Sequence, residues 1–219
     1  VFINNHNHVL ETINRRTIVD SLDVVNYILK SNGGIEQFNT SVDISSTTFT
    51  NIQLGDTLVL NVAVNILNRA FQQKDISSVV FGSSLETIGF AAFVSCGSLS
   101  SVDFTNCLDL SSIGDLAFLG CTSLTSVDLS GCTALHTIGN SAFFGCSILS
   151  SVDFTDCIEL QSIDNSAFQN CRSLTSVDFS GCLKLDTIGF FAFQNCTDLS
   201  SVYLEIGLKE IGSHAFRDD

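Results

Sequence analysis

The stretch Leu124-Thr-Ser-Val-Asp-Leu-Ser-Gly-Cys-Thr-Ala-Leu-His-Thr-Ile-Gly-Asn-Ser-Ala-Phe-Phe-Gly-Cys-Ser-Ile148 is followed immediately by a variant of itself that begins at Leu149. The dipeptide Ala-Phe marks the same period along most of the chain. Its Phe recurs with a spacing of 25, and with end spacings of 22 and 23, at Phe71, Phe93, Phe118, Phe143, Phe168, Phe193 and Phe216. A fixed period of this length is the signature of a repeat protein in which each period forms one structural unit.

Written as one unit, the pattern is Leu-x-x-Val-x-(Leu/Phe)-x-x-Cys-x-x-Leu-x-x-Ile-Gly-x-x-Ala-Phe-x-x-Cys. Apolar residues alternate along its opening segment, which predicts a short strand with one buried side. A single unit cannot cover that side. Neighbours stacked at about the 4.8 Å inter-strand distance would align like residues into continuous ladders. The sequence therefore predicts a solenoid of short parallel strands.

The second half of each unit predicts a bend and a helical turn. Gly follows the Ile of the second strand in every unit but one, where Asp164 replaces it, and both residues tolerate tight bends. We expect a short helical turn centred on Ala-Phe, with the small Ala at the turn and the Phe filling the interior. The predicted fold class is an α/β solenoid.

The first 56 residues do not repeat. Apolar residues between Val9 and Lys30 follow helical spacing, and Asn32-Gly33-Gly34 is a stop signal, so we expect an N-terminal amphipathic helix that caps the first coil. Segments 35–38, 42–49 and 58–64 resemble strands. The predicted organisation is a helical cap with a degenerate first coil over 1–56, followed by a solenoid of about seven units over 57–219.

The pattern Leu-x-x-Ile-Gly-x-x-Ala-Phe-x-x-Cys-x-x-Leu-x-x-Val resembles the Treponema-type, or BspA-like, leucine-rich repeats over roughly residues 57–216. Four units between 99 and 198 depart from the common family unit in a longer connection that carries a second Cys, as in Ser130-Gly131-Cys132. The resemblance implies a leucine-rich repeat array. It also implies extracellular or cell-surface proteins of bacteria, protists and some large viruses that act in adhesion and partner binding, without enzymatic activity.

Charge and motifs exclude several classes of function. The formal net charge is −14, which repels phosphate backbones and makes nucleic acid an unsuitable partner. No apolar run approaches the ~20 residues of a membrane-spanning helix. Motifs of nucleophilic, phosphate-binding or zinc-dependent catalysis are absent, so we expect neither an enzyme nor a cofactor.

Outward positions of the first strand give the candidate binding face. Asp recurs there beside a column of Ser, and Tyr203 takes the Asp position in the last unit. Two interpretations of the stacked carboxylates are open: a binding surface, or a solvated polar face that prevents sheets from associating. A calcium site would need six to eight oxygen ligands, which this pattern does not supply, so no metal is expected. The candidate residues are Asp103, Asp128, Asp153, Asp178, Ser101, Ser126, Ser151, Ser176 and Tyr203.

Nine cysteines fall into two registers at the repeat period without any Cys-x-x-Cys pair. This pattern argues against a zinc site and favours buried free thiols. Two sequons, at Asn39 and Asn195, are candidate glycosylation sites if the protein is secreted.

The last repeat ends in His214-Ala215-Phe216, and no capping pattern follows it. We therefore expect the end at His214 and Phe216 to permit end-to-end stacking into a homo-polymer. The functional hypothesis is an extracellular or cell-surface protein that binds a protein or another cell-surface ligand and assembles head-to-tail into filaments. The alternative is an intracellular protein-interaction scaffold, where free thiols are natural.

Overall fold

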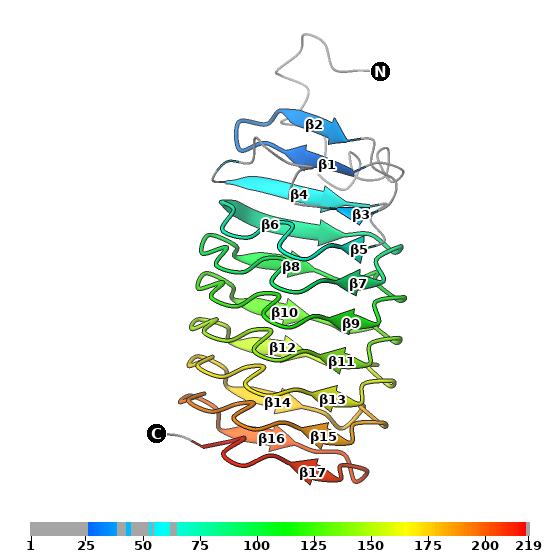
Figure 1. Cartoon of the computed structure of the whole chain (residues 1–219), viewed down its shortest axis with the longest axis vertical. Helices are drawn as coiled ribbons and strands as arrows, with labels where there is room; N and C mark the ends of the chain where they lie inside the picture. Colours follow the sequence, from blue (N-terminus) through cyan, green and yellow to red (C-terminus); the bar gives the residue numbers. More distant parts are fainter. Residues whose placement is uncertain (1–25, 39–42, 45–52, 54, 62–64, 218–219) are drawn as a thin grey trace.

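The computed structural model describes residues 26–38, 43–44, 53, 55–61 and 65–217. These residues form coils that stack along one long axis, with the two strands of each coil lying on different sides (Figure 1). The first strands are β1 (Asn26–Leu29), β2 (Ile35–Phe38), β4 (Asp56–Leu60), β6 (Ile76–Phe81), β8 (Ser101–Asp103), β10 (Ser126–Asp128), β12 (Ser151–Asp153), β14 (Ser176–Asp178) and β16 (Ser201–Tyr203). The second strands are β3 (Asp43–Ile44), β5 (Asn65–Ile66), β7 (Thr87–Ile88), β9 (Ser112–Ile113), β11 (Thr137–Ile138), β13 (Ser162–Ile163), β15 (Thr187–Ile188) and β17 (Glu210–Ile211).

Parallel pairing between equivalent strands confirms the predicted solenoid. The second strands form one continuous sheet from β3 to β17. The first strands form a sheet in the order β12-β10-β8-β6-β4-β1-β2 and a separate pair, β14-β16. From β6 onward the register matches equivalent residues of successive coils, so that Val127 lies between Val102 and Val152.

Stacked aromatic rings fill the interior. The Phe of each Ala-Phe pair stacks on its equivalent in the next coil, with ring centroids 5.0–5.2 Å apart from Phe71 to Phe216. Phe104 meets Phe118 edge to face at 6.4 Å and thereby joins the first strand to this ladder. Burial of such rings, at roughly 1.5–3 kcal/mol each, stabilises every coil together with its buried Leu, Val and Ile side chains.

The predicted helical turn at Ala-Phe is wrong, and the described residues contain no helix. Alternate backbone N–H groups in this segment point to different partners. Ala117 donates within its own coil to Gly114 at 3.2 Å, whereas Phe118 donates to Ala142 of the next coil at 2.7 Å. Leu116, with φ of 59°, interrupts right-handed backbone. A helix needs every donor for itself, so bonding between coils replaces it with consecutive turns.

Gly at the end of the second strand allows the backbones of neighbouring coils to pack closely. A Cβ added to Gly114 would lie 2.8 Å from the carbonyl oxygen of Ile88 and 2.9 Å from the carbonyl carbon of Gly89. Neighbouring coils therefore meet backbone to backbone here, and the residue is needed for space as well as for the predicted bend.

The predicted N-terminal helix is wrong where the structure describes it. Asn26–Leu29, inside the predicted segment from Val9 to Lys30, is β1, and it pairs antiparallel with both β2 and β4. These two ladders satisfy the backbone that a helix would have satisfied internally, while Ile28 is buried. The first 25 residues lie outside the described residues. The strand predicted at 35–38 is confirmed as β2. The division at residue 56 remains a prediction.

A buried carboxylate fastens the β1–β2 hairpin to the first coils. Asp56, only 1% exposed, lies at the start of β4. Its Oδ2 pairs with Lys30 Nζ at 3.1 Å and accepts a hydrogen bond from Gln53 N at 3.0 Å, and its Oδ1 accepts one from Ser31 N at 3.0 Å. Burial acts to raise the pKa of Asp56, but these hydrogen bonds and the Lys30 charge outweigh burial and lower it.

All nine cysteines lie within 65–217, where each is buried and none forms a disulfide bond. The thiols donate to carbonyl oxygens of the preceding coil. Cys121 Sγ reaches Phe93 O at 3.2 Å, and Cys146 Sγ reaches Phe118 O at 3.3 Å. Each thiol thus satisfies a buried carbonyl group, which a purely apolar residue of similar size would leave without this partner.

Candidate binding face

The predicted Ser and Asp columns lie together on the outward side of the first strands. In β8, β10, β12 and β14 the Ser and Asp are exposed and the Val between them is buried. The register places Asp128 between Asp103 and Asp153, and Tyr203, 58% exposed, beside Asp178. Strand alternation therefore puts the predicted face where the sequence indicated.

One carboxylate oxygen of each Asp also terminates its strand. Oδ1 accepts the backbone N–H two residues further on, at 2.8–2.9 Å, in the pairs Asp103–Thr105, Asp128–Ser130, Asp153–Thr155 and Asp178–Ser180. Hydrogen bonds from the hydroxyl and the backbone N–H of Ser180 lower the pKa of Asp178. The spacing Asp-x-(Ser/Thr) is a sequence signal of such a turn.

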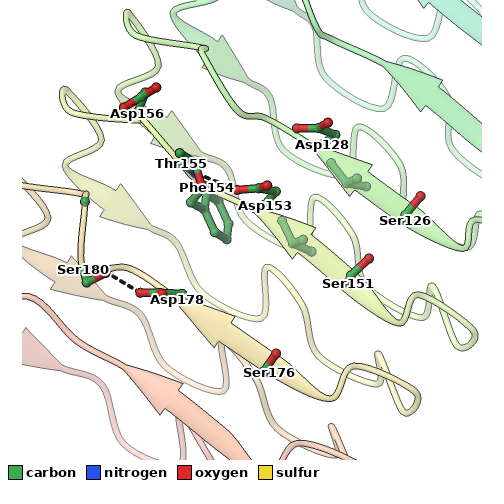
Figure 2. Close-up of a pocket in the computed structure, with 13 residues that line it drawn as sticks. Ser126, Asp128, Ser151, Asp153, Phe154, Thr155, Asp156, Ser176, Asp178 and Ser180 are labelled. Carbon is green, nitrogen blue, oxygen red and sulfur yellow. Dashed lines mark hydrogen bonds between the residues drawn. The ribbon is translucent and has the colours of Figure 1, made fainter.

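A groove of about 640 Å³ crosses the face at β10, β12 and β14 (Figure 2). It brings together six of the predicted residues: Ser126, Asp128, Ser151, Asp153, Ser176 and Asp178. It adds Asp156, Thr155, Ser180 and Gly181 from the turns that follow β12 and β14, which sequence reasoning missed. Ser101, Asp103 and Tyr203 do not line the groove.

The groove spans an interruption in the sheet. Among the described residues, β12 and β14 lie side by side without a hydrogen-bonded ladder between them, whereas the second strands of the same coils, β13 and β15, are paired. Just before these strands, Thr175 N still donates to Ser150 O at 3.3 Å. The coils are therefore joined on one side and less tightly joined on the side that carries the groove.

The neighbouring hydroxyl column belongs to the scaffold. Ser150 Oγ donates to Thr125 O at 3.0 Å, and Ser200 Oγ donates to Thr175 O at 3.1 Å. Equivalent bonds join Ser100 to Ser77, Thr125 to Ser100 and Thr175 to Ser150. These hydroxyls support the contact between coils, and this leaves the Ser101 and Asp103 columns as the outward polar groups.

The remaining candidate residues lie elsewhere. His214 is exposed and stacks on Phe191 at 5.4 Å, and Phe216 is half-buried against Phe193. Asn195 is half-buried, and its Nδ2 donates to Asn170 Oδ1 at 2.9 Å, so that glycosylation would require this bond to break. Asn39 lies outside the described residues.

Among the described residues, no group of three or more His, Cys, Asp or Glu side chains is arranged to hold a metal ion. That part of the chain also has no helix with the length and apolar character of a membrane span. The candidate site is therefore a polar, acidic surface with a groove.

Comparison with protein families matches residues 42–147 and 112–219 to the BspA type leucine-rich repeat region, in six copies. The chain belongs to this family. Membership in the BspA-type family confirms the resemblance inferred from the repeat, and it is consistent with a protein-binding role.

Solved structures similar to this BspA-type chain are bacterial leucine-rich repeat proteins. The T. pallidum leucine-rich repeat protein is 22% identical over 66% of this chain and 83% of its own, with a TM-score of 0.45. A Bacteroides ovatus leucine-rich repeat protein is 21% identical over 86% of this chain and 54% of its own, with a TM-score of 0.47. A leucine-rich cell surface protein of Faecalibacterium prausnitzii is 16% identical over 83% and 75%, with a TM-score of 0.36. Comparison with curated proteins gives no match.

Proposed function

We propose that this chain is a non-enzymatic binding protein, displayed outside the cell or on its surface, that uses the first-strand face to adhere to a protein or another cell-surface ligand. The groove over β10, β12 and β14 carries this proposal. Its walls come from three coils in near-identical positions, and the paired second strands β11, β13 and β15 hold these coils together on the other side. Such preorganisation lowers the ordering cost of binding.

Photo-crosslinking on intact source cells tests the binding face. Ser151→p-benzoylphenylalanine places the crosslinker in the groove, and Gln161→p-benzoylphenylalanine places it at an exposed position before β13 in the same repeat. The expected result is a discrete adduct from position 151 only. Equal adducts from both positions, or adducts from 161 alone, would contradict binding through this face.

Surface proteolysis separates the extracellular location from the intracellular alternative. Treating intact source cells with a protease that does not enter them should remove the protein while a cytoplasmic marker stays intact. Full protection until lysis would overturn the surface location and support the intracellular scaffold.

We also propose that copies stack end to end through the apolar side chains exposed on the coil of β16 and β17. Ile206 is 98% exposed, and Leu204 and Ile211 are 41% and 48% exposed. Negative-stain microscopy should show filaments of the native protein and single arcs for Ile206→Lys. Single arcs of the unaltered protein at micromolar concentration would contradict assembly.

A further inference from the structure

An exposed apolar ridge runs beside the acidic groove. It consists of Ile158 and Leu183, the residues directly after Cys157 and Cys182, which are 42% and 64% exposed. They occupy the same place on adjacent coils and form one patch, and the equivalent residue of the preceding coil is Thr133. Exposed apolar patches mark interaction sites.

Short turns tie the ridge to the wall of the groove. Ile158 N donates to Asp156 O at 2.8 Å, and Leu183 N donates to Gly181 O at 3.0 Å. Asp156 and Gly181 both line the groove. The apolar ridge therefore lies alongside the acidic groove at the coils of β12 and β14.

The negative charge of the groove favours a partner whose polar side chains carry positive charge. Among the residues that the structure describes, the groove is lined by Asp128, Asp153, Asp156 and Asp178 and by neither Lys nor Arg. Lys184, which follows Leu183 on the ridge, is paired with Glu159 at 2.6 Å. A partner that places positive charge in the groove relieves repulsion between stacked carboxylates, and its apolar side chains cover the ridge.

The spacing of the coils selects the conformation of that partner. Successive rungs lie about 4.8 Å apart, while a helix presents one residue per side every 5.4 Å and a strand one every ~6.7 Å. Across the three coils of the groove, the residue spacing of a helix laid along the axis differs from the spacing of the rungs by only about 1 Å in total. For a strand the total difference is about 4 Å. Helical residues three and four apart also form the two adjacent stripes needed here.

We infer that the first-strand face docks a cationic amphipathic helix of a partner protein, with its basic stripe over the groove and its apolar stripe on the ridge. This inference rests on the proposed binding function and specifies the chemistry of the partner.

Fluorescence anisotropy with the full chain tests the inference. The probe is a fluorescein-labelled, Ala-based 14-residue peptide with Lys along one helical stripe and Leu along the adjacent one, compared with a scrambled peptide of identical composition. The scrambled peptide, and one with a central Pro, should bind at least about tenfold more weakly, because neither keeps both stripes on a helix. Equal binding by either peptide would overturn the helical partner.

Matched variants locate the docking site. Asp153→Asn with Asp178→Asn keeps an oxygen acceptor for each turn and should weaken peptide binding roughly tenfold at low salt, whereas Glu86→Gln with Asp198→Asn removes the same charge elsewhere and should change it little. Ile158→Ser should weaken binding and Ile148→Ser should not, although the two side chains are similarly exposed at 42% and 45%. Equal effects within either pair would overturn the site.

The peptide and crosslinking experiments separate this inference from the proposed function. Failure of the peptide experiments together with a discrete adduct at position 151 would overturn this partner chemistry alone. Absence of the adduct would overturn the proposed binding face itself.

Discussion

At the scale of single residues, Asp56 shows how a buried charge can hold a solenoid together. Asp56→Asn removes the ion pair with Lys30 and weakens the acceptors for Ser31 and Gln53. We expect a loss of about 1–3 kcal/mol in the free energy of unfolding at neutral pH, because Lys30 loses its ion-pair partner and two backbone N–H groups keep only a weaker acceptor. Chemical denaturation followed by circular dichroism measures this loss.

The pKa of Asp56 also gives this loss a pH dependence. Since folding lowers the pKa, the carboxylate stabilises the protein fully above its unfolded-state pKa, and this contribution disappears as the pH falls through the folded-state value. The difference between the unaltered protein and Asp56→Asn should therefore shrink below about pH 4. A difference that is constant from neutral to acidic pH would contradict this role.

The thiols have a chemical consequence that can be counted. Burial raises the pKa of Cys96 to about 11 and that of Cys132 to about 12. Thiolate is the reactive form, so native protein should give almost no reaction with a thiol reagent at about pH 8. Denatured protein provides the control and should release all nine thiols. Rapid labelling of native protein would contradict the burial of the two Cys registers.

At the scale of structural elements, the closest approach between coils occurs at the end of the second strand. Gly114→Ala puts a methyl group against backbone atoms of Ile88 and Gly89, which cannot move aside as a side chain could. We expect it to destabilise the fold by about 1–3 kcal/mol. Gly97→Ala is the control, because its added Cβ meets only the Thr122 hydroxyl at 3.7 Å. Similar melting temperatures for the two variants would disprove the steric argument.

The regular elements were predictable because their residues repeat. Val faces inward and Asp faces outward at equivalent places of β8, β10, β12 and β14, as Val127 and Asp128 do in β10. Alternation along a strand alone specifies this arrangement. Strand pairing follows from the same repeat, since like residues stack on like. The outward Ser and Asp columns of the candidate face were predictable for the same reason.

The elements that were predicted wrongly have partners distant in sequence. The bond from Phe118 to Ala142, and the pairing of Ile28 with β2 and β4, override the local helical pattern. The groove was not predictable because it depends on how β12 and β14 separate. Equivalent residues are nearly identical from coil to coil, so the repeat itself gives no indication of where its pairing is interrupted.

At the scale of the whole molecule, each coil contacts only its neighbours, and the cost of a cavity depends on where it lies. Phe143→Ala opens a space inside the ring ladder, between Phe118 and Phe168, and should cost about 3–5 kcal/mol. Phe216→Ala should cost less, because that ring is only half-buried.

Unfolding curves followed by circular dichroism compare the two. Phe143→Ala should also broaden the transition, since weakening a central interface uncouples the coils on either side of it. Equal losses from the two variants, with sharp transitions in both, would contradict a quasi-one-dimensional fold.

The bonding between coils determines how the molecule responds to force. Tension applied along the solenoid axis loads the hydrogen bonds between adjacent coils a few at a time, so that they break one after another. The cysteines form no disulfide bonds, so among the described residues no covalent cross-link between coils stops the separation. Each released 25-residue coil would add roughly 80–90 Å of extended chain. If copies link a cell to a surface, the tether they form would lengthen coil by coil under load before its contact with the surface breaks.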